Sequence, residues 1–250
     1  MTYCVGLDLQ GGLVLLSDTR TNAGVDHVST FSKMHVVEVP GERLIAMLSA
    51  GNLAVTQAVV NLLNEGIERS QGPESPRLET LANVPSMFRA AQLVGEAIRR
   101  VYVKDGQAMQ AQNVAFEVSI LLGGQIKGRT MRLFEVYSAG NFIEATPDTP
   151  YLQIGEHKYG KPILDRVVHA GMVLEDGVKV VLISMDSTLR SNLGVGLPID
   201  LLVYRRDSLR VGLRRRLTEE DAYFRLIRDG WSAALREAYQ TLPRPGWMDD

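Results

Sequence analysis

The sequence has 250 residues, of which 45% are hydrophobic and 22% are charged, and its formal net charge is −2. These values are typical of a globular protein with a sizeable core, and they give no electrostatic reason to expect a nucleic acid or an anionic membrane as partner. No stretch approaches the roughly 18 apolar residues of a membrane span, and no signal peptide is expected. The single cysteine, Cys4, excludes an internal disulfide and favours a reducing compartment, so we expect a cytoplasmic protein.

The first half of the chain predicts paired strands followed by two helices. Alternating and continuous apolar runs predict two hairpins, whose strands cover 3–9, 13–17, 35–39 and 43–49. Asn52 is the expected N-cap of the first helix, because the apolar period changes directly after it. Apolar residues three or four apart predict a second helix over 85–104. The stretch 70–77 contains two prolines and is expected to be a loop.

The second half predicts strands, two helices, strands and a last helix. Strands are expected over 114–124 and 130–138, and a helix over 161–170. The valines of 174–192 favour a strand, but its apolar residues keep helical spacing and acids occupy its first turn, so we interpret it as a helix. A final helix is expected to begin at Thr218. The strands before this helix are predicted over 195–207 and 208–214.

This order predicts an α+β fold in which two stacked sheets lie between helical layers. The strands occur in hairpins and not singly between helices, which excludes a Rossmann arrangement. Residues 1–250 are expected to form one domain, because neither a repeat nor a linker divides them. The sandwich is expected to be complete by Arg206. Residues 207–250 would then form a C-terminal strand and helix extension whose apolar face suits subunit contacts.

Thr2 is the first candidate catalytic residue. A small residue behind the initiator favours removal of Met1, after which the chain begins with a threonine that carries a hydroxyl and a free α-amine. The amine can take the hydroxyl proton, so one residue supplies both nucleophile and base. The amine must then be neutral near pH 7, and a neighbouring cation lowers its pKa from about 8. Without supporting residues, Thr2 would be an ordinary terminus.

Asp18 and Lys33 suit the supporting roles. Asp18 ends the second predicted strand, and the turn returns it close to Thr2. Lys33 lies just before the third strand, and a buried cation needs a carboxylate partner because its desolvation is costly. Alternatively, Asp18 caps a turn and pairs with Arg20, and Lys33 is a solvated surface lysine.

These residues and their surroundings resemble the β subunits of proteasomes. The resemblance is carried by Lys33, the helical tail and the stretches MTYCVGL, SDTRTNAGVD, SAGN, IGEHKYGKPILDR and MDSTLRSNLGVGLPIDLLVY, so it covers almost the whole chain. The family consists of N-terminal nucleophile hydrolases with a four-layer αββα sandwich. Within it, the chain is most similar to the bacterial proteasome-related homologs. The resemblance therefore implies the αββα fold and self-assembly into a ring or a helical stack.

The resemblance also implies a role for each matching residue. Thr2 is the nucleophile and its amine the base, while Lys33 tunes the amine and Asp18 holds Lys33. The N–H of Gly51 points into the oxyanion hole, where a glycine lets the chain approach the substrate closely. Ser191 falls where the family has a serine near the N-terminal amine, although it equally suits a hydroxyl at the end of a helix.

Three features depart from the family pattern. Lys33 follows Thr2 by one residue fewer than expected. The aspartate that supports the serine normally lies three residues before it, where this chain has Thr188, whereas Asp186 lies five residues before Ser191. Asp186 is therefore a candidate whose role is open. Glu156 stands where proteasomes usually have a small serine, so the details of proton transfer are expected to differ.

The predicted function is a threonine hydrolase that attacks peptide or other amide carbonyls through an acyl-enzyme ester. A non-peptide amidase or acylase fits the same residues, and the alternative from another class is a self-assembling, catalytically silent shell or binding protein. No cofactor is expected, and the four histidines lack ligand spacing, so no metal is expected either. The expected partners are copies of the chain and an amide substrate. The sequence indicates neither the ring symmetry nor an ATPase partner.

Overall fold

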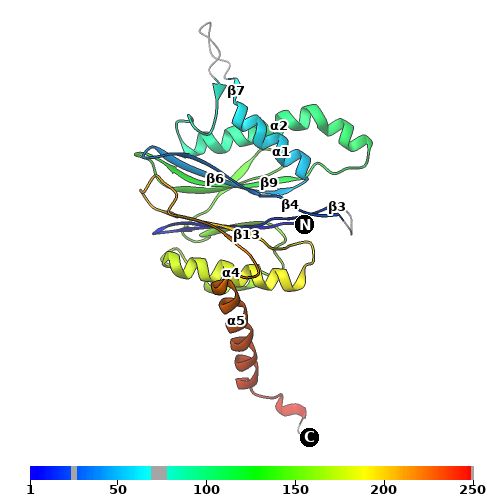
Figure 1. Cartoon of the computed structure of the whole chain (residues 1–250), viewed down its shortest axis with the longest axis vertical. Helices are drawn as coiled ribbons and strands as arrows, with labels where there is room; N and C mark the ends of the chain where they lie inside the picture. Colours follow the sequence, from blue (N-terminus) through cyan, green and yellow to red (C-terminus); the bar gives the residue numbers. More distant parts are fainter. Residues whose placement is uncertain (24–26, 69–77, 249–250) are drawn as a thin grey trace.

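Two five-stranded antiparallel sheets lie face to face between layers of helices (Figure 1). A computed structural model describes residues 1–23, 27–68 and 78–248. In strand order, the first sheet contains β12 (Tyr151–Gly155), β1 (Tyr3–Leu9), β2 (Gly12–Asp18), β13 (Ile199–Arg205) and β14 (Leu213–Leu217). The second contains β11 (Phe142–Glu144), β10 (Arg132–Val136), β9 (Val118–Ile126), β6 (Arg43–Gly51) and β5 (Met34–Val39). The αββα sandwich implied by the resemblance is therefore confirmed.

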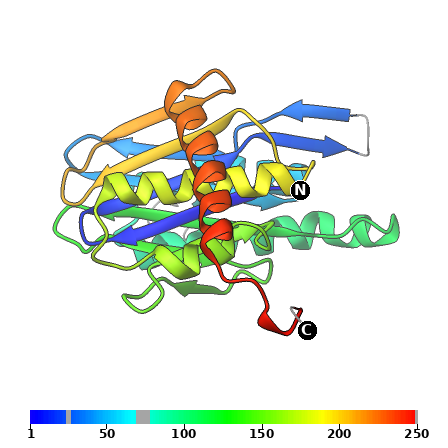
Figure 2. The ribbon, with the colours of Figure 1, turned by 90° about the horizontal axis from the view of Figure 1, so that it is seen from below.

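Helices cover the outer face of each sheet (Figures 1 and 2). The second sheet packs against α1 (Leu53–Glu65) and α2 (Met87–Ala111), and the first against α3 (Lys161–Val167) and α4 (Leu174–Ser191). The remaining elements are the hairpins β3 (Arg20–Ala23) with β4 (His27–Thr30) and β7 (Ile67–Glu68) with β8 (Leu78–Glu79), α5 (Ala222–Thr241) and a short 3₁₀ helix, Gly246–Met248. None of the helices in the described ranges is both long and apolar enough to cross a membrane.

Strands β1 and β2 are buried on both faces, which explains their continuous apolar sequence. Val5 and Leu7 of β1 face the helical layer, whereas Cys4 faces the other sheet. Val14 and Leu15 of β2 divide between the two cores in the same way. Side chains alternate along a strand, so a central strand between two apolar layers needs an apolar residue at nearly every position.

The local signals at the start of α1 and along α4 are confirmed. Asn52 caps α1, and its Oδ1 accepts hydrogen bonds from the backbone N–H groups of Ala54 at 3.0 Å and Val55 at 3.4 Å. The ambiguous segment 174–192 is helical over Leu174–Ser191. The helical spacing of its apolar residues outweighs the strand preference of its valines, because that spacing places them on the face against the first sheet.

Several predicted boundaries are wrong. Helix α2 ends at Ala111 and not at 104, and the strand expected from 114 begins at Val118. The strand expected over 208–214 lies at Leu213–Leu217, and the last helix begins not at Thr218 but at Ala222, where Asp221 is the N-cap. The helix expected over 161–170 already ends at Val167. The loop predicted over 70–77 lies outside the described residues.

The sandwich is not complete by Arg206. The chain reverses after β13 through Asp207 and Leu209, which both have positive φ angles, and then adds β14 to the edge of the first sheet. Leu217 and Phe224 are buried in the core between this sheet and its helices. The first part of the C-terminal extension therefore belongs to the fold.

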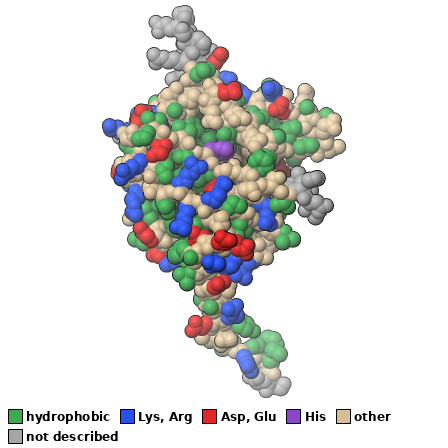
Figure 3. Space-filling view, in the orientation of Figure 1, with side chains coloured by type: hydrophobic (Ala, Val, Ile, Leu, Met, Phe, Trp, Pro, Cys, Tyr) green, Lys and Arg blue, Asp and Glu red, His purple; other side chains and the backbone are tan. Residues whose placement is uncertain are grey.

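Helix α5 projects from the sandwich on the side of α4 (Figures 1 and 2). Phe224 is its buried residue, whereas Leu226, Leu235 and Tyr239 are 66%, 50% and 78% exposed. Hydrophobic side chains also lie at the tip of the projecting segment (Figure 3), where Trp247 is 79% exposed. This amphipathic helix thus leaves most of its apolar surface uncovered within one chain.

Gly12 is required by the close approach of β2 and β13. Its φ is +148°, and a Cβ there would lie 1.9 Å from the backbone oxygen of Tyr204. We expect Gly12→Ala to lower the free energy of unfolding by about 3 kcal/mol or more, because backbone and not a flexible side chain must move. Urea unfolding measures this loss. The matched control is Gly41→Ala, where φ is +73° but no atom lies within 4 Å, so its cost should be only about 1 kcal/mol. Equal losses in the two variants would contradict the argument.

Candidate active site

Thr2 is buried at the start of β1 and is fixed through its backbone. Its carbonyl oxygen accepts a hydrogen bond of 2.6 Å from the N–H of Glu156, and the next N–H, of Tyr3, donates to Asp18 Oδ1 at 3.0 Å. Gly155 allows the approach of β12, because a Cβ at this glycine would lie 2.1 Å from the Thr2 oxygen. Strands β12 and β2 therefore hold the N-terminus from either side.

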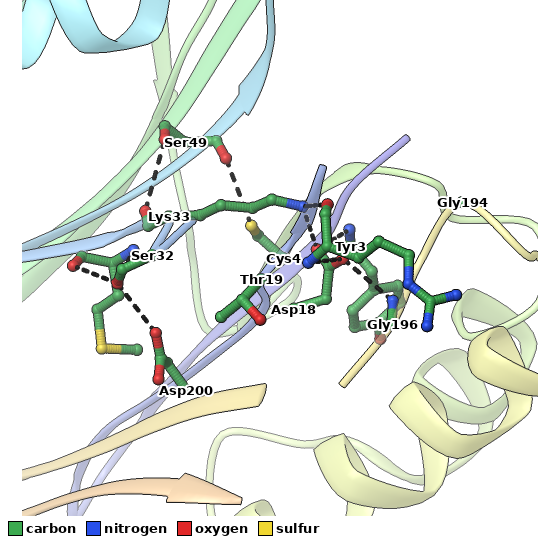
Figure 4. Close-up of polar contacts among 12 residues, drawn as sticks. Tyr3, Cys4, Asp18, Thr19, Ser32, Lys33, Ser49, Gly194, Gly196 and Asp200 are labelled. Carbon is green, nitrogen blue, oxygen red and sulfur yellow. Dashed lines mark hydrogen bonds and ion pairs between the residues drawn. The ribbon is translucent and has the colours of Figure 1, made fainter. Parts of the chain in front are cut away.

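Asp18 and Lys33 form a buried ion pair (Figure 4), and Asp18 also accepts a hydrogen bond from the N–H that directly follows Thr2 in the chain. Lys33 Nζ lies 2.6 Å from Asp18 Oδ1 and donates a second bond of 2.8 Å to the carbonyl of Arg20. The other Asp18 oxygen accepts from the N–H groups of Arg20 at 3.2 Å and Gly196 at 3.3 Å. The carboxylate thus receives hydrogen bonds from four residues, three of them distant from it in the sequence, and holds the lysine among them.

The charge state of Asp18 follows from these contacts. Burial raises the pKa of its carboxyl above the ordinary value, while the Lys33 charge and the bonds from Lys33, Tyr3 and Gly196 lower it. All of these neighbours are donors, and donors favour the ionised carboxylate. The four donors around Asp18 therefore suit a carboxylate paired with Lys33.

Thr2, Lys33 and Gly51 line one pocket of about 340 Å³. Gly51 ends β6 with a φ of +114°, and a Cβ there would lie 2.2 Å from the carbonyl oxygen of Glu117. The first turn of α1 also lines the pocket, so the partial positive charge of a helix N-terminus faces it. The other lining residues are Met1, Thr21, Asn22, Ser32, His35, Ser49, Ala50, Asn52, Leu53, Thr56 and Gln57.

The structure does not join Ser191 or Asp186 to this group. Ser191 is the exposed last residue of α4, and within the described part of the chain no hydrogen bond links it to Thr2, Asp18 or Lys33. Asp186 is buried one turn earlier and accepts a bond of 3.0 Å from Arg190 Nε. It lines a different pocket, toward α5, so the roles implied for both residues receive no support from their positions.

The sequence patterns did not indicate Asn192 as a residue of this region, and they assigned no role to Glu156. Asn192 Nδ2 donates to Glu156 Oε2 at 2.8 Å, and its Oδ1 accepts from Gly194 N–H at 2.8 Å. Burial raises the pKa of Glu156, but the bonds from Lys158 N–H and Asn192 outweigh it and hold the pKa below its ordinary value. The Glu156 carboxylate, bonded to the Asn192 amide, thus lies where proteasomes usually have a small serine. No local signal in the sequence indicates that these two segments meet.

Met1 lies beside this pair and is 66% exposed. A Cβ on Gly194 would lie 2.6 Å from Met1 Cβ and 3.1 Å from Asn192 Oδ1, so Met1 passes directly over the segment that follows α4. The N-terminus accordingly lies at the C-terminal end of α4 in both ribbon views (Figures 1 and 2). With Met1 present, the Thr2 nitrogen is a peptide amide and not an amine.

The described residues hold no group of three His, Cys, Asp or Glu side chains arranged to bind a metal ion. The chemistry that this arrangement supports is nucleophilic attack by a residue at the N-terminus. A hydroxyl, a fixed cation and a backbone glycine face one another across one pocket, and such groups can activate a nucleophile and stabilise a developing oxyanion.

Comparisons with known proteins agree with this geometry. Residues 2–203 match the proteasome-subunit family. The chain is 50% identical to Anbu (ancestral β-subunit) from Yersinia bercovieri, over 97% of this chain and 98% of that one, with a TM-score of 0.87. It is 49% identical to the Anbu complex from Pseudomonas aeruginosa, which forms a helical assembly, over 97% of this chain and 98% of that one, with a TM-score of 0.89. An Anbu mutant from Hyphomicrobium sp. strain MC1 is 49% identical, over 98% of this chain and 99% of that one, with a TM-score of 0.88. No curated protein matches. The chain therefore belongs to the proteasome-subunit family and is a proteasome-related protein of the Anbu type.

Proposed function

We propose that the chain is a threonine-type N-terminal nucleophile hydrolase of peptides or other amides. The observation that carries the proposal is that Thr2 and Lys33 line one pocket, while the buried Asp18 holds the Lys33 ammonium at 2.6 Å. A fixed cation beside a free α-amine disfavours a second positive charge, and the amine is then neutral enough to act as a base near pH 7.

The proposed reaction begins after Met1 has been removed. The Thr2 amine accepts the hydroxyl proton as Oγ attacks the amide carbon, and the carbonyl electrons move to the oxygen, which Gly51 N–H stabilises. The protonated amine then gives its proton to the departing nitrogen, the C–N bond breaks, and Thr2 carries an ester. Water adds to this ester with the amine again as base, and its hydrolysis restores the threonine.

Covalent labelling tests this proposal. A threonine-reactive probe should label protein that has lost Met1, and peptide mass spectrometry should locate the label on Thr2. Processed Thr2→Ala is the control and should remain unlabelled. A fully processed wild type that no such probe labels would favour the catalytically silent shell.

We also infer that copies of the chain assemble through the C-terminal extension, in a ring or in a helical stack like that of the Pseudomonas aeruginosa relative. The support is α5, a helix of 20 residues whose last nine residues are all exposed. An exposed helical stretch of this length is marginal in water, so a partner that covers its apolar face would stabilise it. The buried free thiol of Cys4 fits the cytoplasm, which we propose as the location of the assembly.

Paired substitutions on α5 test the assembly. Leu235 and Tyr239 are one turn apart and 50% and 78% exposed, so changing both to serine should convert the assembly to smaller species. Sedimentation velocity measures the shift, and the melting temperature should change by no more than about 3 °C because neither side chain is in the core. Changing Arg236 and Gln240, which are also exposed, to serine is the matched control. A wild type that sediments as a monomer at micromolar concentration would refute the inference.

A further inference from the structure

Strand β14 lies beyond the residues that match the proteasome-subunit family, and yet its hydrogen bonds lead to the candidate pocket. Arg214 lies opposite Leu202 of β13, and Arg216 lies opposite Asp200. Leu202 belongs to the core between the two sheets, so these arginines are on the face of β14 that looks toward the other sheet. Arg215 is on the other face, toward α5.

A chain of hydrogen bonds leads from Arg216 to the pocket. Its Nε and Nη2 donate to the two carboxylate oxygens of Asp200 at 2.7 and 2.8 Å. Asp200 is buried, and its Oδ2 accepts a bond of 2.9 Å from the hydroxyl of Ser32 (Figure 4). Ser32 lines the pocket directly before Lys33. Such a bidentate contact fixes the orientation of a carboxylate as well as its position.

A second residue of β14 acts on the same wall of the pocket. Burial and then the charge of Arg214 lower the pKa of His35, an imidazole that lines the pocket, so both act against its protonation. Lys33, in contrast, is held independently of β14 by Asp18 and the carbonyl of Arg20. Strand β14 therefore influences the side of the pocket that Ser32 and His35 form. It makes no part of the Lys33–Asp18 ion pair that supports the nucleophile.

We propose that Arg216 is a positioning residue of the pocket. Through Asp200 it fixes Ser32, so the substrate-binding wall is completed by a strand of the C-terminal extension. The kinetic test of this inference rests on the proposed hydrolase function. The effect of Arg216 on the position of Ser32 can be measured without any turnover.

The kinetic test compares Arg216→Ala with Arg215→Ala in processed protein. Both variants remove an arginine from β14, but Arg215 contacts Asp221, away from the pocket. We expect Arg216→Ala to raise KM about tenfold with kcat changed less than about twofold, as when a substrate-binding contact is lost. Arg216→Lys, which keeps the charge without the bidentate contact, should lie between wild type and Arg216→Ala. In a Ser32→Ala background, Arg216→Ala should raise KM no further. A loss of folded protein would instead lower the apparent kcat at unchanged KM, and that result overturns the proposal.

Hydrogen exchange tests the same proposal without turnover. In Met1-retaining protein, Arg216→Ala should speed amide exchange over 31–35 about tenfold, whereas Arg215→Ala should leave it unchanged. Exchange in α2 is the internal reference, because a general loss of stability would speed both segments equally. If the wild type hydrolyses nothing but this difference appears, the hydrolase proposal fails and the positioning role stands. Equal exchange over 31–35 in the two variants would overturn the positioning role.

Discussion

Thr2→Ala in protein that has lost Met1 should reduce hydrolysis of amide and ester substrates by about 10⁴-fold or more. The substitution removes the hydroxyl that attacks the carbonyl and keeps the α-amine, Lys33 and Asp18. Folding and assembly should be unchanged, because the backbone oxygen of Thr2 ties it to the sandwich, and its hydroxyl makes no hydrogen bond to any described residue. The measurement is the rate on a panel of short amides and esters, with intact mass confirming that Met1 is absent.

Two companion forms separate the roles of the hydroxyl and the amine. Thr2→Ser keeps both groups and should retain part of the activity. Wild type that retains Met1 keeps the hydroxyl but has an amide nitrogen, whose lone pair is delocalised and accepts no proton, so it should be folded and inactive. If processed wild type and processed Thr2→Ala react at equal rates, Thr2 is only a terminus and the hydrolase proposal falls.

Among the residues around Thr2, Asp18 was predictable because short-range structure places it there. A tight hairpin of β1 and β2 pairs Cys4 with Ser17, which sets Asp18 next to the chain start whatever the rest of the fold does. Asn52 and Gly51 likewise lie at a strand-to-helix junction with its own cap signal. Lys33 precedes a strand, and its contact with Asp18 follows once the two sheets are stacked.

The residues after α4 were not predictable from the same signals. Consecutive side chains of a helix point about 100° apart. If the resemblance places the family's serine one residue too early or too late in this sequence, a different side chain faces the site. Here the buried side chain is Asn192, while Ser191 faces solvent. Its partner, Glu156, comes from a strand end 36 positions earlier, and only the tertiary fold brings the two together.

The error at β14 has a conformational origin. The turn after β13 uses Asp207 and Leu209 at positive φ, and leucine rarely adopts this conformation, so its sequence does not indicate a turn. The three consecutive arginines of β14 do not form an apolar pattern either, because four of the five residues of this edge strand are exposed. Two of these arginines nevertheless face the pocket side of the sandwich.

Lys33→Ala in processed protein should lower kcat at neutral pH by about 10²-fold or more, the size of effect expected when a general base is lost. Without the cation, the Thr2 amine has a higher pKa and remains protonated and unable to accept the hydroxyl proton. The acid limb of the pH–rate profile should therefore move to higher pH, and part of the activity should return above pH 8. Substitution should also destabilise the fold by about 3–5 kcal/mol, because Asp18 loses its partner inside the protein.

The double variant Lys33→Ala/Asp18→Asn separates catalysis from stability. Replacing the carboxylate by a neutral amide removes the unpaired buried charge, so urea unfolding should show that much of the lost stability returns. The activity should not return, because no cation remains beside the amine. Activity recovered together with stability would mean that the ion pair only supports the fold. If Lys33→Ala keeps the kcat and the acid limb of the wild type, Lys33 does not lower the pKa of the Thr2 amine. Nothing in the proposed site would then explain how this amine acts as a base near pH 7.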